Sequence, residues 1–384
     1  MSITLPAVYT DRMSLKPTIW IEVSKSAFEH NVRTVRALTR PETKLMAVVK
    51  SNAYGHGLVA TAKIFTKAGA DWLGVFSIDE AIELRKKGVR APILVMGPTD
   101  IGNFKTALRY KLRVTIYDRS VLQNTAIKIS AKLPIHIKID TGLSRQGVPM
   151  ERVQEFFGAI PRGLTIEGIY SHLADPEDFE KQAFSRFQSK NFETAIEIAR
   201  NFGYGKLIKH LVASDGLLSF PQGEFDMVRV GLFLYGLWPS DSFQKQFKSI
   251  QLQPALSCKT RIAQVKKIPK GAYVGYGITE RMKHDTIIAV VPIGYWDGYP
   301  RSLSSRGVVL VGGKRCRVLG RISMNMTVVD ATDAGVVHAG DEAVLIGRQG
   351  ESFIGAEELA EFAGTISHEI VTRINPLLPR IVVQ

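Results

Sequence analysis

The sequence predicts two domains, an N-terminal (β/α)8 barrel of the TIM type over residues 15–245 and a mainly β domain over residues 246–384. The first part alternates short apolar runs with amphipathic helical patterns, and eight such alternations are typical of a parallel barrel. The second part has short runs rich in β-branched residues between glycine-containing turns. The length of 384 residues also exceeds that of a usual single core.

The first predicted element is a strand over residues 18–23, which is followed by an amphipathic helix. Ser26 and Glu29 have the spacing of a capping box, in which each side chain bonds the backbone N–H of the other residue. Phe28 and Val32 stand at helical spacing behind this cap. We therefore expect Ser26 to cap the helix.

The eight barrel strands are predicted from apolar runs in which β-branched residues are frequent. Helical patterns lie between them, and the clearest cover residues 58–68, 78–87 and 178–201. The strands are predicted at residues 44–50, 71–77, 91–96, 112–118, 134–140, 164–172, 206–214 and 226–231.

Reactive and basic residues stand at the ends of several predicted strands. In such barrels the active site lies at the carboxyl ends, and phosphate groups commonly bind to the loops after strands seven and eight. We therefore expect these side chains to converge on one face. They are Lys50 after strand one, Lys138, Asp140 and Arg145 at strand five, His172 at strand six, Ser214 at strand seven, and Arg229, Gly231 and Leu232 at strand eight.

Lys50 follows two valines and precedes a turn rich in glycine, asparagine and serine. At the mouth of a buried strand the amine is partly desolvated, which lowers its pKa and favours the neutral, nucleophilic form. An ordinary lysine at a strand end that reaches solvent explains the same position. The residue alone therefore leaves both interpretations open.

Beyond residue 240 the pattern becomes that of a β domain. The polar segment 240–253 is the expected boundary, and residues 1–14 are candidates to pack with the second domain. Strands are predicted at residues 256–265, 286–292, 308–311, 315–319, 327–330 and 342–346, with one helix at 356–363.

Composition narrows the classes of function. Hydrophobic residues make up 45% of the chain, but no apolar run approaches the ~18 residues of a transmembrane helix, and the first residues lack the pattern of a signal peptide. A cytoplasmic protein without a membrane partner is expected. The formal charge of +14 is spread along the chain without a nucleic-acid-binding motif, so no nucleic-acid partner is expected. Cys258 and Cys316 have no metal spacing and are expected in strands as free thiols, and no metal site is expected.

Several separated motifs resemble those of the alanine racemases. Residues 48–57, Val-Val-Lys-Ser-Asn-Ala-Tyr-Gly-His-Gly, are similar to the pyridoxal-phosphate lysine motif of that family. The resemblance implies a fold-type-III enzyme that binds pyridoxal 5′-phosphate and a small amino acid. Further matches lie at residues 136–142, 226–231, 254–257, 275–277, 293–298 and 320–324.

The resemblance assigns the two proton-transfer residues. Lys50 would hold the cofactor covalently and act as acid and base on one face of the substrate α-carbon, and Tyr276 would act on the other face. Racemisation needs both, because a proton leaves one face and another arrives at the opposite face. Tyr276 and Met324 would come from the second domain of the other subunit, which implies a homodimer with shared active sites. Without the flanking motif, Tyr276 would be read as a tyrosine that closes a turn.

The family also assigns the cofactor contacts. Arg229 would face the pyridine nitrogen, and because a guanidinium does not give up its proton, the ring would be a weak electron sink. His172 would lie beside Arg229, although a core histidine is an equal interpretation. The phosphate would be bound by Tyr54, Ser214, Gly231 and Leu232.

Arg145 and Met324 would bind the substrate, and Lys138 is the position that can carry a carbamate in this family. A carbamate would replace a cation beside Arg145 by an anion that accepts hydrogen bonds. Tyr295, Arg301 and His368 resemble the residues of the active-site entrance.

Three positions depart from the family pattern: Asn325 replaces a usual aspartate, His368 a usual tyrosine, and Ala213 a usual asparagine. They leave the preferred amino acid open between alanine and another substrate such as serine. A decarboxylase of this barrel type would usually place an acid on the ring nitrogen, which Arg229 disfavours. A non-catalytic pyridoxal-phosphate-binding protein is generally a lone barrel. With L-alanine as substrate, the product would be D-alanine for peptidoglycan.

Overall fold

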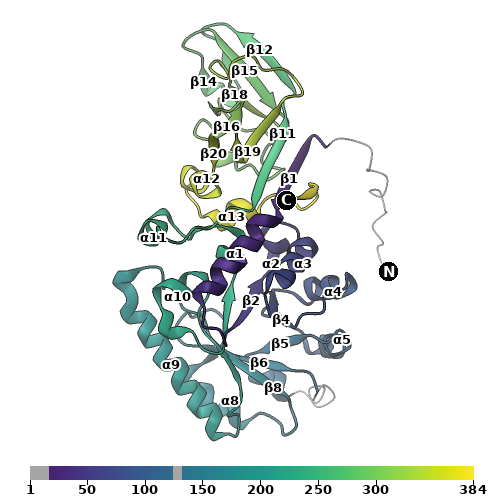
Figure 1. The fold of residues 1–384 in the computed structure, drawn as a ribbon, viewed down its shortest axis with the longest axis vertical. Coiled ribbons are helices and arrows are strands. Elements are labelled where there is room, and N and C mark those ends of the chain that lie inside the picture. Colours follow the sequence, from purple (N-terminus) through teal and green to yellow (C-terminus); the bar gives the residue numbers. More distant parts are fainter. Residues whose placement is uncertain (1–16, 124–131) are drawn as a thin grey trace. The chain divides into compact units, whose positions relative to one another are not determined.

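The computed structural model describes residues 17–123 and 132–384, shown in Figure 1. The expectation for residues 1–14 falls outside them. The chain forms two compact units. The barrel unit contains residues Val23–Leu256, Gly355–Pro376 and Val382–Gln384, and the β unit contains the described residues up to Glu22, Ser257–Ile354 and Leu377–Ile381. The domain boundary near residue 245 stays a prediction.

The barrel unit is built on a sheet of eight parallel strands, as the sequence predicts. Its strand order is β10-β2-β3-β4-β5-β6-β8-β9, and two backbone hydrogen bonds, Asp226 N–H to Lys209 O and Arg229 N–H to Val212 O, nearly close it between β9 and β10. A short strand β7 (Val148–Pro149) pairs with β6. The eight strands are β2 (Lys44–Val48), β3 (Trp72–Val75), β4 (Ile93–Val95), β5 (Arg113–Ile116), β6 (Ile135–Asp140), β8 (Ile166–Tyr170), β9 (Ile208–His210) and β10 (Met227–Val230).

The barrel strands are buried on both faces, which explains their continuous apolar sequences. Met46, Trp72, Leu94 and Met227, from four strands of the sheet, pack together as one cluster. Burying each such side chain stabilises the fold by about 1.5–3 kcal/mol. The parallel register follows from this packing, since a slip by one residue would exchange the two faces of a strand.

Helices cover the outside of these strands, and Figure 1 shows α3, α4 and α5 beside β2–β5. The predicted helices at 58–68, 78–87 and 178–201 are confirmed within a few residues. The barrel unit contains α1 (Lys25–Leu38), α3 (Leu58–Ala68), α4 (Ile78–Lys86), α5 (Phe104–Arg109), α6 (Arg119–Gln123), α8 (Val153–Gly158), α9 (Gln182–Asn201), α10 (Ser214–Ser219), α11 (Asp241–Gln246), α12 (Ala356–Ala363) and α13 (Ser367–Thr372).

The predicted cap of the first helix is wrong by two residues. Ser24, not Ser26, is the N-cap, because the backbone is still extended at Ser24 and its hydroxyl accepts a hydrogen bond from Ala27 N–H at 3.1 Å. A capping box does occur at α4, where Ser77 and Glu80 bond each other's backbone N–H groups. The segment 240–253, expected as a boundary, contains α11.

The β unit is mainly strand, as predicted. One sheet has the order β17-β16-β19-β11-β1-β21 with β20 beside β19, a second has β12-β15-β18, and β13 pairs with β14. The strands are β1 (Ile19–Ser24), β11 (Leu256–Arg261), β12 (Gln264–Ile268), β13 (Tyr273–Val274), β14 (Glu280–Arg281), β15 (Thr286–Val291), β16 (Val308–Val311), β17 (Lys314–Arg317), β18 (Thr327–Asp330), β19 (Glu342–Gln349), β20 (Ser352–Ile354) and β21 (Arg380–Val383).

The strand predicted over residues 256–265 is two strands, because the chain changes sheet in its middle. Ile262 N–H bonds Asp341 O, whereas the next N–H, of Ala263, bonds Val290 O. Cys258 and Cys316 lie buried in β11 and β17 as free thiols, which confirms the expectation. Among the helices of residues 17–123 and 132–384, none is long and apolar enough to cross a membrane.

Candidate active site

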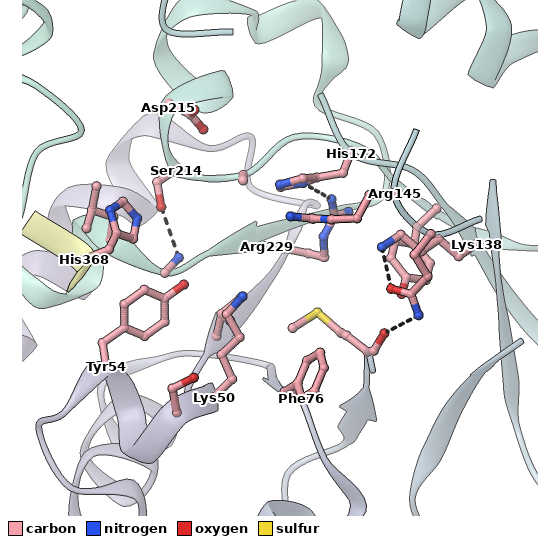
Figure 2. A pocket seen from close by; sticks show the side chains of 18 of the residues that line it. Lys50, Tyr54, Phe76, Lys138, Arg145, His172, Ser214, Asp215, Arg229 and His368 are labelled. Atoms are coloured by element: carbon pink, nitrogen blue, oxygen red, sulfur yellow. Dashed lines mark hydrogen bonds between the residues drawn. The ribbon is translucent and has the colours of Figure 1, made fainter. Parts of the chain in front are cut away.

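A cavity of about 770 Å³ lies in the barrel unit at the carboxyl ends of the strands. Figure 2 shows the side chains that point into it. The structure brings together there all the strand-end residues predicted from the sequence except Asp140, and adds Tyr54 and His368. The predicted residues that line the cavity are Lys50, Tyr54, Lys138, Arg145, His172, Ser214, Arg229, Gly231, Leu232 and His368.

Lys50 and Tyr54 stand at the two ends of one left-handed turn, α2 (Lys50–Tyr54). Strand β2 ends at Val48, two residues before the predicted end, and the four residues Ser51 to Tyr54 have φ values of 57, 55, 53 and 51°. L-amino acids rarely adopt this conformation, which costs roughly 1–2 kcal/mol per residue. The turn is held by tertiary contacts, since Glu80 Oε1 accepts from Ser51 N–H at 2.6 Å and Asn52 Oδ1 accepts from Leu58 N–H at 2.9 Å.

The amine of Lys50 points into the cavity (Figure 2). Burial lowers the pKa of Lys50, the positive charge of Arg145 lowers it further, and Glu80 opposes both effects. A larger fraction of neutral amine is therefore available than for an exposed lysine. This favours the nucleophilic interpretation of Lys50 over that of an ordinary strand-end lysine.

Donors for an anion meet at the other end of the turn. Ser214 Oγ accepts a hydrogen bond from Gly231 N–H at 3.1 Å, and a Cβ on Gly231 would lie 2.6 Å from the hydroxyl oxygen of Tyr54. The Tyr54 ring stacks on Tyr235 at 4.7 Å. Burial raises the pKa of Tyr54 to about 12, and Asp215 adds to this rise, so the phenol keeps its proton and can donate it in a hydrogen bond.

Arg229 is a buried cation on the wall of the cavity, with 4% of its surface exposed. Its Nη1 donates to His210 Nδ1 at 3.0 Å, and Nη2 donates to the carbonyl oxygens of Ser171 and Leu211 at 2.6 and 2.7 Å and to His172 Nδ1 at 3.2 Å. Burial lowers the pKa of Arg229 to about 10, so the group stays charged near neutral pH. These contacts leave Nε–H without a partner among the described residues.

Two histidines of the cavity are neutral near pH 7. Burial lowers the pKa of His172 well below its usual value, and the charge of Arg229 adds to this effect. Burial also lowers the pKa of His368, whose ring lies 6.0 Å from the Tyr54 ring. The Nδ1 atom of His368 is buried without a hydrogen-bond partner in the described part of the chain. His368 therefore has an unused hydrogen-bonding atom at the end of the cavity where Tyr54 lies.

Lys138 also lines the cavity (Figure 2), and its Nζ donates to Gln146 Oε1 at 3.0 Å. Burial and the charges of Arg229 and Arg145 lower the pKa of Lys138 to about 8. At neutral pH a measurable fraction of this amine is uncharged.

Sequence reasoning missed several cavity residues, including Phe76, Gln146 and Asp215. Gln146 follows Arg145, and Asp215 follows Ser214, so position next to a predicted site residue was the available signal. Burial raises the pKa of Asp215. Phe76 lies just after β3, and no reactive or basic residue at this strand end indicated a site there.

Four predicted site residues belong to the β unit and do not line this cavity: Tyr276, Tyr295, Arg301 and Met324. All four are exposed in the single chain, with Tyr276 71% and Met324 55% accessible. Tyr276 begins a short 3-10 turn (Tyr276–Ile278) between β13 and β14.

Two family models match the chain. The alanine racemase N-terminal domain matches residues 23–239, and the alanine racemase C-terminal domain matches residues 255–382. The alanine racemase of Leptospira interrogans is 40% identical over 384 aligned residues, which cover 96% of this chain and 97% of that protein.

Solved structures agree with this match. The alanine racemase of the D-cycloserine producer Streptomyces lavendulae superposes with a TM-score of 0.90 at 36% identity, covering 96% of this chain and 98% of that one. The alanine racemase of Bartonella henselae, described with covalently bound pyridoxal phosphate, gives a TM-score of 0.85 at 27% identity, covering 96% and 100%. From both family models and from relatives matched over 96% of its length, the chain belongs to the alanine racemase family of pyridoxal-phosphate-dependent racemases.

Proposed function

We propose that this chain interconverts L- and D-alanine by a two-base mechanism, with pyridoxal 5′-phosphate bound in the barrel cavity. The observation that carries the proposal is the left-handed turn, which presents the Lys50 amine at one end and the Tyr54 hydroxyl at the other, facing Gly231. An amine and an anion-binding group at the two ends of one fixed turn suit a ligand that carries both an aldehyde and a phosphate.

The cavity residues fit the cofactor. Ser214, Tyr54 and the backbone of Gly231 and Leu232 would hold the phosphate, where a side chain at position 231 would collide with Tyr54. Arg229, whose Nε–H has no partner among the described residues, would donate to the pyridine nitrogen. Lys50 would supply the covalent link.

When bound, pyridoxal phosphate supplies an electron-withdrawing ring that makes the α-hydrogen of an attached amino acid acidic. Lys50, with its lowered pKa, would take or return the proton on one face of the α-carbon. Tyr276 of the partner subunit would do so on the opposite face, which is consistent with its exposure in the single chain. The active unit would then be a homodimer, with Met324 of the partner subunit beside the substrate.

Arg145 would pair with the substrate carboxylate and Lys138 would carry a carbamate. The pKa of about 8 supports this modification, because only an uncharged amine adds carbon dioxide. Arg229 and Arg145 repel the protonated form of the Lys138 amine. A carbamate would replace this amine by an anion near both cations. Tyr295, Arg301 and His368 would limit the size and charge of entering substrates.

Alanine is the proposed substrate and serine the alternative. Asn325, Ala213 and His368 depart from the family pattern near the substrate and the phosphate, and His368 and Ala213 line the cavity. A cytoplasmic enzyme of this kind would supply D-alanine for peptidoglycan.

The test is incubation of the purified protein and pyridoxal phosphate with L-alanine or L-serine in deuterated water, followed by chiral chromatography and mass spectrometry. We expect inversion with deuterium at the α-carbon, fastest for alanine. The Lys50→Ala variant should abolish it, whereas Lys44→Ala, at the exposed start of the same strand, should not. Inversion of neither substrate would overturn the proposal.

A further inference from the structure

Five charged or ring-bearing side chains form a continuous hydrogen-bonded relay across the barrel. Arg229 Nη1 contacts His210 Nδ1 at 3.0 Å, His210 Nε2 contacts His136 Nδ1 at 2.9 Å, and His136 Nε2 contacts Glu167 Oε2 at 3.2 Å. Arg113 Nε then donates to the same oxygen of Glu167 at 2.9 Å. The relay joins the cavity wall to residues outside the cavity.

The relay is built by neighbouring strands. Arg113, His136, Glu167, His210 and Arg229 lie on β5, β6, β8, β9 and β10, which are successive around the barrel. The parallel register that aligns these strands therefore also aligns the five side chains.

The two ends of the relay determine where every proton lies. A guanidinium has no acceptor, so His210 Nδ1 must accept from Arg229 and His210 carries its hydrogen on Nε2. That hydrogen is donated to His136 Nδ1, and His136 in turn donates its Nε2 hydrogen to Glu167. A carboxylate has no donor, so the three hydrogen bonds from Arg229 to Glu167 all point toward Glu167, and Arg113 donates to the same carboxylate from the other side.

The interior of the relay is buried and closely fitted. His136 and His210 have no exposed surface. The Tyr170 ring is stacked on His210 at 4.7 Å with an interplanar angle of 4°, and Trp72 lies 5.6 Å from the His136 ring. A Cβ on Gly168 would lie 2.4 Å from His136 Nδ1, so the absence of a side chain at 168 makes room for the ring.

Burial and the nearby arginines favour the neutral forms of both rings. His210 faces the cation Arg229, and His136 faces the anion Glu167 with the cation Arg113 behind it. Burial lowers the pKa of both histidines, and Arg229 adds to this effect for His210, whereas Glu167 partly opposes it for His136. A second proton on His210 would remove the acceptor of Arg229 and place a like charge beside it.

We propose that Glu167 and His136 are positioning residues for Arg229, which act through His210 to fix its orientation and to weaken it as a proton donor toward the cofactor ring. This inference rests on the proposed function. The carboxylate partly balances the charge of Arg229, so its guanidinium holds its protons more firmly. Removal of that negative charge makes Arg229 a stronger hydrogen-bond donor and the ring a stronger electron acceptor.

A stronger electron acceptor lengthens the life of the deprotonated substrate, and this favours a side reaction. With pyridoxal phosphate bound, the proton that left the α-carbon could then go to the cofactor carbon that carries the substrate nitrogen. Hydrolysis with one water releases the keto acid and leaves the nitrogen on the cofactor as an amine, so atoms and electrons balance without another reactant. The amount of keto acid per racemisation therefore measures the donor strength of Arg229.

The Glu167→Gln variant tests the charge while it keeps an oxygen that can accept from His136. Asp71→Asn is the matched control, because Asp71 also stands at the start of a barrel strand and pairs with an arginine, Arg36, but does not contact the relay. We expect Glu167→Gln to raise pyruvate formed per alanine racemised by roughly three- to tenfold, the effect of up to one pKa unit on Arg229. The ratio should be unchanged in Asp71→Asn. An unchanged ratio in Glu167→Gln, or an equal rise in both variants, would overturn the proposal.

A second measurement uses the unaltered enzyme and needs no turnover. In ¹⁵N-histidine-labelled protein, long-range ¹H–¹⁵N spectra should show His136 and His210 neutral between about pH 6 and 8, both protonated on Nε2. An imidazolium or an Nδ1–H tautomer at either residue would contradict the relay. Failure of this inference and failure of the proposed function are distinguishable, because a protein without racemase activity would still give the expected spectra if the relay exists.

Discussion

The hydroxyl of Tyr54 occupies the space that a side chain on Gly231 would need, with 2.6 Å between that oxygen and the position of a Cβ. Ser214 accepts from the N–H of the same glycine. Three separate segments of the barrel unit thus meet around one backbone N–H, and the predictions for cofactor binding follow from this arrangement.

The Gly231→Ala variant should bind pyridoxal phosphate at least about tenfold more weakly, because the new methyl group would displace the Tyr54 hydroxyl that we propose as a phosphate ligand. Cofactor affinity can be followed by absorbance titration of the cofactor-free protein. Gly205→Ala is the control, since a Cβ there meets only the Arg200 side chain at 3.9 Å. Equal affinities in the wild type and Gly231→Ala would contradict this use of the glycine.

An ionised Asp215 should lower the affinity of the cavity for a phosphate, because the two negative charges repel each other. Burial raises its pKa, so the carboxyl is neutral at low pH and becomes an anion beside Ser214 as the pH rises through that pKa. We expect Asp215→Asn to bind the cofactor several-fold more tightly at the upper end of a pH 5–9 titration and with a smaller pH dependence. The exposed Asp79 on α4 gives the control variant Asp79→Asn. Weaker binding by Asp215→Asn would show that the ionised carboxylate is useful.

Lys138 should take up carbon dioxide. The neutral fraction of its amine grows as the pH rises through about 8, and the carbamate should grow with it. Protein equilibrated with ¹³C-bicarbonate is expected to give a carbamate resonance that is missing in Lys138→Gln. A wild-type enzyme that is active and lacks this resonance would refute the modification.

Shared active sites can be tested by mixing two inactive variants. If Lys50 acts with Tyr276 of the partner subunit, a mixed dimer of Lys50→Ala and Tyr276→Phe contains one site with both native residues. An equal mixture after subunit exchange should recover about a quarter of wild-type activity, whereas neither variant alone does. Tyr273→Phe, at an exposed tyrosine three residues before Tyr276, is the control. This variant should be active by itself, which would show that the loss of activity in Tyr276→Phe is specific to that tyrosine. No recovery in the first mixture would reject sharing.

The Ser51→Gly variant should be more stable than the wild type. Glycine tolerates φ 57°, whereas serine does not, and the relief of strain exceeds the entropy cost by about 0.5–1 kcal/mol. The melting temperature of the cofactor-free protein should rise by about 1–3 °C. Ser120→Gly in α6 should change it in the opposite direction. A lower melting temperature of Ser51→Gly would mean that the serine hydroxyl stabilises the protein by more than the backbone strain destabilises it.

The barrel strands were predictable because burial on both faces favours continuous apolar runs, such as Leu45 to Val49, and because these runs alternate with helical patterns. The convergence of Lys50, Lys138 and Arg229 followed from the rule for strand ends. The left-handed turn was not predictable, because Glu80, far from it in sequence, holds it. The relay was also missed, since His136, Glu167 and His210 become neighbours only through the register of their strands.

The left-handed turn between Lys50 and Tyr54 links the retention of the cofactor to the integrity of one short segment. If Ser51 to Tyr54 relaxed to an ordinary right-handed conformation, the amine and the hydroxyl would lose their common direction together. The proposed covalent attachment and the proposed phosphate contact would therefore both depend on the contacts that hold this turn, among them the hydrogen bond from Ser51 N–H to Glu80. A change that weakens this one hydrogen bond should accordingly loosen both ends of the cofactor together, although Glu80 touches neither.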